Sequence, residues 1–316
     1  MIRLIASRLG QMLLIMAVVT LVLFAIFDSE QFRRQIATAE LGGFGVATLS
    51  DQDYQNWLDD RGLNEPFLSR YAAWVGKVAT GDLGHSMQKG VAVSTLLGER
   101  LQATAILAFF VFLFMIPIAL TLGVLAGMRE GSWTDRIISL FSVITTSIPQ
   151  IATAVMLTVV FGLGLGWVPT KASMAGGFNG IDLVLPVLTL LIYDIGYVSR
   201  MTRASMAEVM TSHYIRTALL KGIPYGRVIV THALRNALIV PFTLIFLQLN
   251  WLLSQVVVIE VFFQYNGFGR MLYDAAMYGD IEVIQAATLV AVAVAVISQL
   301  LSDIGYVLLN PRVRVQ

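Results

Sequence analysis

Polar side chains within apolar stretches are the residues of this chain whose types could do chemistry. A carboxylate or amide placed in a hydrophobic run is costly in a bilayer, so such a group serves a solute pathway or holds helices together. The residues that fit this description are Gln150, Asp194, Gln248, Asn250, Gln255, Glu260 and Asp303.

Gln248, Asn250 and Gln255 lie in the middle of one apolar run. They could line a polar passage or join neighbouring helices by hydrogen bonds, and the sequence leaves both interpretations open. Glu260 stands near the end of the same run, just before the turn-forming sequence "YNGFGRM". We interpret that turn as a surface loop that is held by Glu260 and Arg270. These two residues, like Asp194 and Asp303, are candidates for a structural or a gating role.

Asp194 and Asp303 each lie toward one end of an apolar run, where arginines are close in the sequence. A carboxylate within a membrane helix is commonly paired with a basic side chain. We therefore expect structural ion pairs in which Arg200, Arg203 or Arg312 neutralises these two aspartates.

A basic stretch in the middle of the chain differs from its apolar surroundings. It is "YIRTALLKGIPYGRVIVTHALRNALIVP" at 214–241. Positive groups around a Gly and a Pro suggest an ordered turn that could meet a partner. The basic residues are Arg216, Lys221, Arg227 and Arg235.

No motif for enzymatic chemistry accompanies these residues. The sequence contains no Gly-x-x-x-x-Gly-Lys-Ser/Thr, no His-Glu-x-x-His and no Gly-x-Ser-x-Gly. It contains no Cys, and His85, His213 and His232 are scattered. We expect no catalytic residue, no metal site and no cofactor bound by this chain.

The elements that must position these residues are membrane spans. The 316-residue chain is 57% hydrophobic and 13% charged, far too apolar for one soluble core, and its net charge of +1 gives no reason to expect nucleic acid. The composition therefore predicts an all-α membrane protein with six transmembrane helices, each spanning roughly 20 residues or more. The apolar runs are 9–27, 103–127, 139–167, 183–202, 237–262 and 282–309.

Two of these runs need comment. The third is too long for a straight span and is expected to tilt or bend near Pro149. The first, preceded by Arg3 and Arg8 and followed by "ATA" at 37–39, has features of a signal peptide. Its apolar stretch is long for one, so we expect it to remain as a span.

The distribution of basic residues predicts the orientation. Most of the 21 Lys and Arg residues fall at the termini and in the loops that an even number of spans places on the same side. Because cytoplasmic loops carry this excess, both termini and the basic stretch are expected inside, in an N-in/C-in arrangement.

We expect residues 1–100 to comprise the first transmembrane helix and a periplasmic segment, and 101–316 to form a five-helix core. Within the periplasmic segment, Ser50 is expected to cap a helix that carries Tyr54, Trp57 and Leu58 on one face. Pro66 is expected to open a second helix.

The cytoplasmic loop at about 203–236 is predicted to be a helical hairpin. The fourth span should continue as a helix until Gly222 and Pro224 stop it, and a second helix should begin at Tyr225. In that second helix Val228, Ile229 and Ala233 are expected to face protein, with Arg227, Thr231 and Arg235 on another side. Basic residues alone are ordinary in inside loops, but an ordered hairpin with an apolar tip favours docking to a soluble partner.

At this loop the sequence resembles the coupling loop of ABC importer permeases, in the branch that includes the dipeptide, oligopeptide and nickel systems. The resemblance rests on "YIRTALLKG" and "HALRNALI" and covers nearly the whole chain. It also includes "GLNEPFLSRYAAWVGKVATGDLGHS", "GSWTDRIISL", "SRMTRASMAEVM", "VVVIEVFFQYNGFGRML" and "LNPRVRV", in the same order.

The resemblance implies a type I ABC importer permease fold and no enzymatic activity. It implies that a short coupling helix enters a cleft on a cytoplasmic ATPase, which binds ATP and Mg. The partners implied are two such ATPases, a second homologous permease and an extracytoplasmic solute-binding protein. The location implied for this chain is the cell inner membrane. The coupling positions that match are Arg216, Thr217, Ala218, Lys221, Gly222, Ile223 and Tyr225.

The chain departs from the family pattern in three places. Arg216 and Thr217 stand where many ABC importers have Glu and Ala, a departure that the peptide branch shares. The segment 28–49 lacks the Gly-Asp-Pro that often follows the first span, and Pro241 falls one residue late, which shifts the expected kink of the fifth span.

The solute is left open between dipeptides, oligopeptides, nickel or metallophore complexes and opine-like compounds. The alternative function is an ion-coupled secondary transporter. That class usually has midplane carboxylates or broken helices within inverted repeats, and the sequence shows neither clearly.

Overall fold

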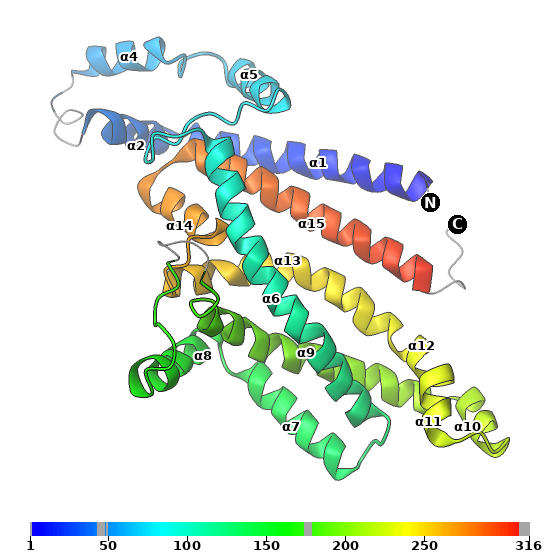
Figure 1. Cartoon of the computed structure of the whole chain (residues 1–316). Helices are drawn as coiled ribbons and strands as arrows, with labels where there is room; N and C mark the ends of the chain where they lie inside the picture. The colour runs from blue at the N-terminus through cyan, green and yellow to red at the C-terminus, as the bar shows by residue number, and fades with distance from the viewer. Residues whose placement is uncertain (1, 43–47, 49, 174–178, 310–316) are drawn as a thin grey trace. The chain divides into compact units, whose positions relative to one another are not determined.

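The computed structural model describes residues 2–42, 48, 50–173 and 179–309, and within these ranges it is helical (Figure 1). The described residues form no strand beyond an isolated bridge between His85 and Ala92. The helices are α1 (Ile2–Phe27), α2 (Glu30–Leu41), α4 (Asp51–Asp60), α5 (Phe67–Ala79), α6 (Val93–Gly127), α7 (Trp133–Ser147), α8 (Gln150–Leu157), the π-helix η1 (Thr158–Gly164), α9 (Val184–Met210), α10 (His213–Leu220), α11 (Tyr225–Val228), the π-helix η2 (Ile229–Ala233), α12 (Leu234–Ala237), α13 (Ile239–Phe262), α14 (Phe268–Tyr278) and α15 (Ile281–Leu309).

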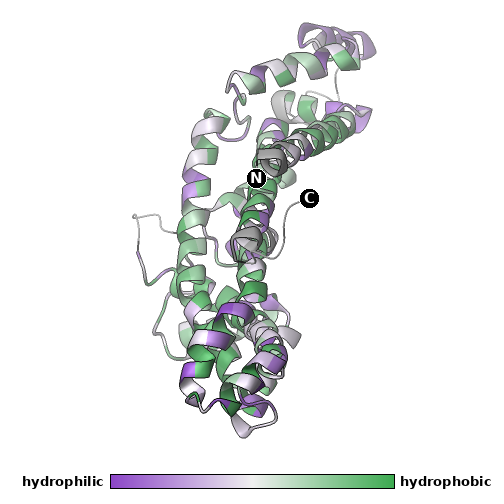
Figure 2. Ribbon diagram, turned by 90° about the vertical axis from the view of Figure 1, so that its right-hand side faces the viewer, coloured by the Kyte–Doolittle hydropathy of each residue, from purple (hydrophilic) through white to green (hydrophobic). Residues whose placement is uncertain are grey.

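Long apolar helices dominate the structure, as the mostly green ribbons of Figure 2 show. By length and composition, α1, α6, α9 and α15 can each cross a membrane. Two bent pairs, α7 with α8–η1 and α11–α12 with the first part of α13, raise the number to six when each pair counts as one span. The predicted all-α membrane fold is confirmed, and the six predicted spans correspond to these four helices and two bent pairs.

The third apolar run bends at Pro149, as its sequence predicts. Its two helical parts meet at 98°, and Ile148 between them is extended with φ −86° and ψ 126°. A residue before proline avoids the helical region because the proline ring clashes with its backbone. Proline at the start of α8 therefore ends α7 and sets the direction of the next helix.

The fifth run is also bent, by 46°, and the break lies at Leu238. Pro241 is the third residue of α13. A proline is tolerated in the first turn of a helix, where its missing N–H has no intrahelical partner. The kink therefore precedes Pro241.

The predicted continuous helix from the fourth span to Lys221 is wrong at one point. α9 ends at Met210, and Ser212 is extended and precedes α10. The Thr211 hydroxyl donates to the Glu208 carbonyl, and the Ser212 hydroxyl donates to the Val209 carbonyl. Such local hydrogen bonds compete with the helical ladder, which explains the break without Gly or Pro.

The chain divides into two compact units. The first comprises Ala103–Gly269 and Ala295–Gln316, and the second comprises Ile2–Gln102 and Arg270–Val294. In the first unit, α7 and α13 pack against α9. The α6 backbone also comes close to α9, because a Cβ on Gly123 would lie 2.6 Å from the Ser199 carbonyl oxygen. Only glycine allows this approach.

The second unit contains the two short helices that the sequence predicts after the first span. The Ser50 hydroxyl accepts from the Asp53 N–H at the start of α4, and α4 buries Tyr54, Trp57 and Leu58. Pro66 precedes α5. Both predictions are confirmed, and the residues 43–47 and 49 of the segment with the missing Gly-Asp-Pro lie outside the described part.

Candidate functional site

The basic stretch forms a hairpin of short helices. α10 ends at Leu220, the chain turns through Lys221–Pro224, and α11, η2 and α12 return. Gly222 has φ +77°, a left-handed conformation that residues with a side chain rarely adopt. Gly222 and Pro224 therefore end the first helix, as the sequence predicts.

A buried apolar cluster joins the two arms of the hairpin. Ile215 of α10 packs with Val228, Ile229 and Ala233 of the returning arm, and Met206 of α9 belongs to the same cluster. As predicted, these residues of the returning arm are buried while Arg227, Thr231 and Arg235 are exposed. The hairpin is thus an ordered extension of α9 and not a loose loop.

The predicted coupling residues fall into two groups. Arg216, Thr217, Lys221, Gly222 and Tyr225 are exposed, next to Leu220, which is 80% exposed. Ile223 is partly buried against the cluster, and Ala218 is buried within it. The exposed group, with Leu220, forms the hairpin tip and offers apolar, aromatic and basic side chains together.

Two hydrogen bonds fasten the hairpin to the helices beside it. The Tyr225 hydroxyl donates to the Met128 carbonyl, just after α6. The Ser205 hydroxyl of α9 donates to the Ala237 carbonyl at the end of α12. Both contacts link residues that are distant in the sequence, so the tip is held by tertiary structure.

An ion-pair network near the hairpin was not predicted from the sequence. Arg203 binds both oxygens of Asp135, at 2.9 and 2.8 Å, and also reaches Glu130 at 3.2 Å. Ser132 caps α7 by accepting from the Asp135 N–H. The spacing Ser-x-x-Asp before an apolar helix was the available signal for this cap, but nothing local pointed to Arg203.

The predicted ion pair of Asp194 with Arg200 or Arg203 is wrong. Asp194 is buried on α9 and accepts a 3.0 Å hydrogen bond from the Gln248 amide of α13, while Arg203 is engaged by Asp135. Gln150 similarly donates to Gln255 at 2.7 Å. Two of the three mid-run amides therefore tie α13 to neighbouring helices in this structure.

The remaining predicted polar residues are placed as follows. The side chain of Asn250 and the residue Arg312 lie outside the described part of the structure. Asp303 of α15 accepts from Gln299 one turn earlier, at 3.2 Å. Arg270 of α14 pairs with Asp274 at 3.8 Å.

Glu260 is fully buried, so the predicted surface loop is wrong in this respect. Its carboxylate accepts from the Thr104 hydroxyl at 2.5 Å, and the same hydroxyl accepts from the Phe268 N–H at 2.8 Å. A Cβ on Gly267 would lie 2.0 Å from the Glu260 Oε1 atom. We call Glu260, Thr104, Gly267 and Phe268 the glutamate clamp, which holds the turn after α13 against α6.

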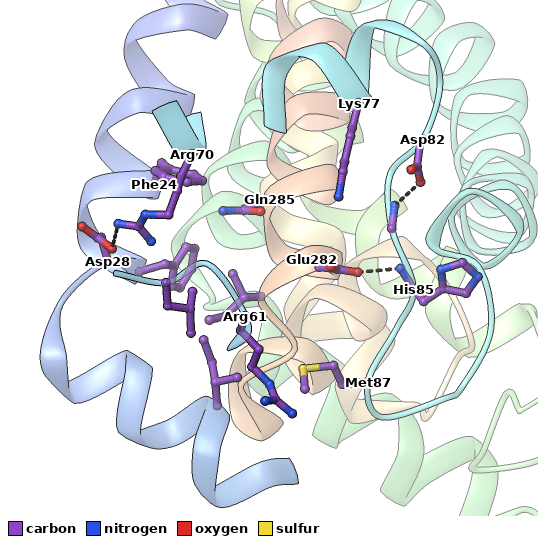
Figure 3. Close-up of a pocket in the computed structure, with 15 residues that line it drawn as sticks. Phe24, Asp28, Arg61, Arg70, Lys77, Asp82, His85, Met87, Glu282 and Gln285 are labelled. Atoms are coloured by element: carbon purple, nitrogen blue, oxygen red, sulfur yellow. Dashed lines mark hydrogen bonds and ion pairs between the residues drawn. The ribbon is translucent and has the colours of Figure 1, made fainter. Parts of the chain in front are cut away.

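The second unit contains a pocket of about 540 Å³ (Figure 3). Figure 3 shows Lys77 extending into it from α5, with Arg70 beside Phe24 and bound to Asp28. Burial opposes ionisation of Asp28, but the hydrogen bonds and charges of Arg70 and Arg33 outweigh it and hold its pKa below the usual value.

Two carboxylates at the start of α15 hold the loop that precedes α6. Glu282 accepts from the His85 N–H at 2.5 Å, and Asp280 accepts from the Ser86 hydroxyl at 2.5 Å. A Cβ on Gly84 would lie 2.2 Å from a Glu282 oxygen. These contacts order the sequence "GDLGHS" at the edge of the pocket.

Groups that could perform catalysis do not assemble in the described residues. No three His, Asp or Glu side chains of this part of the chain converge as metal ligands would. The geometry instead provides an ordered, exposed hairpin and helices tied by buried polar pairs, which suits a transport component that works with a partner.

Comparison with known proteins agrees with this geometry. Residues 119–315 match the family described as "Binding-protein-dependent transport system inner membrane component". The chain is 34% identical over 272 residues to the oligopeptide transport system permease protein AppB of Bacillus subtilis, covering 84% of this chain and 86% of the relative. It is 32% identical over 276 residues to a probable peptide ABC transporter permease of Sinorhizobium fredii, covering 84% and 87%.

A third relative, the dipeptide transport system permease protein DppB of Alkalihalophilus pseudofirmus, is 32% identical over 282 residues, with 81% of this chain and 85% of the relative covered. The match to the family profile and the length of these alignments agree with a multi-span helical chain that transports and does not catalyse. The chain therefore belongs to the family of inner membrane components of binding-protein-dependent transport systems.

Proposed function

We propose that the chain is one permease subunit of an ATP-driven importer for a peptide-like solute, and that its hairpin tip docks on a cytoplasmic ATPase. The observation that carries this proposal is the tip itself. Leu220 is 80% exposed and Tyr225 36% exposed, at the end of a hairpin whose two arms are joined by a buried apolar cluster. Large exposed apolar side chains next to an ordered turn are typical of a surface that a partner covers.

Two further features support coupling through this hairpin. Its buried cluster includes Met206 of α9, and Tyr225 is bonded to Met128 after α6. A displacement of the tip would therefore be passed to two long helices and not absorbed by a flexible loop. Ala218 supports the hairpin from within, and Arg216, Thr217, Lys221, Gly222, Ile223 and Tyr225 are the proposed docking residues.

The rest of the assembly follows the family. We propose both termini inside, a first helix with a periplasmic segment in residues 1–100, and a five-helix core in 101–316. A second homologous permease would complete the pathway, two ATPases would bind ATP and Mg, and an external binding protein would deliver the solute. Of the two described mid-run amides, Gln248 is buried and Gln255 is partly exposed, so we propose that Gln255 faces the pathway as well as binding Gln150.

The coupling proposal is tested by purifying the tagged chain from native membranes in mild detergent and identifying the proteins that come with it. We expect an ATPase and a second permease with the wild type, and loss of the ATPase in Tyr225→Asp. Tyr225→Phe is the matched control, because it keeps the ring and removes only the hydroxyl that bonds to Met128. A chain that purifies alone in all three cases would favour an ion-coupled carrier instead.

Gly222 provides a second test of the same site. Gly222→Ala places a Cβ on a residue with φ +77°, at a cost of about 1–2 kcal/mol, and should distort the tip. Gly226→Ala is the control, since a Cβ there meets nothing within 4 Å and its φ is not positive. At equal membrane abundance we expect solute uptake to fall only in the first variant, and equal uptake in both would contradict the docking site.

The peptide assignment rests on the named relatives from Bacillus, Sinorhizobium and Alkalihalophilus. It is tested by measuring uptake of radiolabelled dipeptides, longer peptides and nickel in cells with and without the chain. Loss of peptide uptake alone is the expected result. Loss of nickel uptake with peptide uptake intact would identify nickel as the solute in place of peptide, and the coupling proposal would be unaffected.

A further inference from the structure

Helix α5 packs against the end of a membrane span. The Phe24 ring of α1 is surrounded by Phe67, Tyr71 and Trp74 of α5, with ring centroids 5.4, 5.6 and 6.2 Å away. Phe24 lies in the last turn of the candidate span Leu9–Phe27. Aromatic side chains gather at this depth in membrane proteins, where the hydrocarbon meets the headgroups.

Two contacts determine which way α5 faces. The Tyr71 hydroxyl lies 2.9 Å from the Thr20 hydroxyl and 3.3 Å from the Ala17 carbonyl oxygen, so it points toward the middle of the span. Arg70 binds Asp28, just beyond the end of the span (Figure 3). Neighbouring residues of a helix are about 100° apart. One flank of α5 therefore faces the membrane centre and the other faces water.

The flank on the Tyr71 side is apolar and uncovered. At helical spacing it consists of Leu68, Ala72, Val75 and Ala79, and all four are exposed, Leu68 by 71%. An apolar row exposed at the depth of Phe24 lies where water gives way to acyl chains.

The flank on the Arg70 side is polar. Lys77 lies on it and extends into the pocket, whose lining also includes Glu282 and Gln285 (Figure 3). The helix thus carries apolar side chains on one flank and charged side chains on the other. The apolar flank is the one that the Tyr71 contact directs toward the membrane centre, and the charged flank is the one that the Arg70 contact directs toward water.

We propose that α5 is an interfacial helix whose flank of Leu68, Ala72, Val75 and Ala79 inserts among the acyl chains of the leaflet at the Phe27 end of α1. Lipid is the expected occupant because the neighbouring face of α1 is exposed and apolar at Val22 and Ile26. The apolar flank of α5 therefore continues the apolar surface of a candidate membrane span. Arg70 and Lys77 then lie at the level of the headgroups. This inference does not depend on which solute is carried or on the hairpin.

The chain contains no Cys, so a single cysteine can report the surroundings of each flank. Ala72→Cys and Ala73→Cys form a matched pair, because both are exposed alanines of α5 that differ by one helical step. Leu68→Cys and Ser69→Cys form a second pair. Each full-length variant is labelled with an environment-sensitive fluorophore and studied as the purified transporter in nanodiscs, where both sides are accessible.

We expect labels at 72 and 68 to emit at shorter wavelength and to be quenched several-fold more by lipids brominated in the acyl chains than labels at 73 and 69. Aqueous iodide should quench in the opposite order. Iodide quenching at 72 and 68 equal to that at 73 and 69 would overturn the proposal, because the row would face water. Protection of 72 and 68 from both quenchers would also overturn it, because protein would then cover the row.

Discussion

At the scale of single residues, the glutamate clamp shows how one buried carboxylate shapes a turn. Glu260 has no exposed surface and is reached by the Thr104 hydroxyl, which also accepts from the Phe268 N–H. A buried carboxylate requires such donors because desolvation is costly. The glycine at 267 lets the turn approach the carboxylate more closely than any side chain would allow.

Gly267→Ala should therefore destabilise the protein by about 1–3 kcal/mol, because the new Cβ would lie 2.0 Å from Glu260 Oε1. Thermal unfolding followed by tryptophan fluorescence in detergent should give a lower midpoint. The control is Gly98→Ala in α6, where a Cβ meets nothing within 4 Å. An unchanged midpoint for both variants would mean that the clamp has no rigid geometry.

At the scale of helices, the contact between α7 and α9 includes an ion pair between one charged residue of each. Arg203 binds two carboxylates, and these differ in burial, with 5% of the Asp135 side chain and 56% of the Glu130 side chain exposed. An exposed pair contributes little because water screens it, whereas losing a partner in a buried pair leaves an uncompensated charge.

Asp135→Asn should consequently reduce the free energy of unfolding by about 3 kcal/mol and clearly lower the unfolding midpoint. Glu130→Gln should change the free energy of unfolding by less than about 1 kcal/mol. Both changes remove one negative charge near Arg203, so total charge is matched. Thermal unfolding of the two variants beside the wild type provides the measurement. Equal shifts would show that burial does not determine the strength of this network.

Helices α1, α2 and α5 meet at Asp28, which accepts from Arg33 and Arg70. The pKa of Asp28 is lowered in the folded protein, so its contribution to stability is present above the unfolded value of about 3.9 and is lost as the pH falls through the folded value. The unfolding midpoint of Asp28→Asn should lie below that of the wild type by a constant amount from pH 7 to 5. The difference should shrink below about pH 4, and a difference that grows there would contradict the assignment.

At the scale of the whole molecule, the hairpin carries exposed positive charge on a surface that we propose meets a partner. Arg216, Lys221, Arg227 and Arg235 are all exposed. Four positive groups on one projection should favour an acidic partner surface, and such attraction weakens when salt shortens the Debye length from about 10 Å at 0.1 M to 3 Å at 1 M.

We therefore expect the amount of ATPase that copurifies with the chain to fall as the salt concentration rises over that range. The double variant Arg216→Gln and Lys221→Gln should retain less ATPase at low salt and show a weaker salt dependence. Copurification that is independent of salt in both proteins would assign the docking to the apolar residues Leu220 and Tyr225 alone.

The amino-acid sequence by itself determined the class of fold and several of the positions at which helices begin or break. Apolar runs of sufficient length specify spans because the free energy of transfer to a bilayer adds up along a local stretch. Pro149, Gly222 and Pro224 marked breaks correctly because their backbone restrictions are also local. The cap at Ser50 and the buried face of α4 followed from the same short-range rules.

Only the tertiary structure decided which polar groups meet. Asp194 accepts a hydrogen bond from Gln248 and does not pair with an arginine. Arg203 forms its buried ion pair with Asp135, and Glu260 accepts a hydrogen bond from Thr104. These partners are far apart in the sequence, and their approach depends on which helix faces pack together. Periodicity identifies a side chain as polar and places it on a span, but the choice of its partner is made by the packing of the helices.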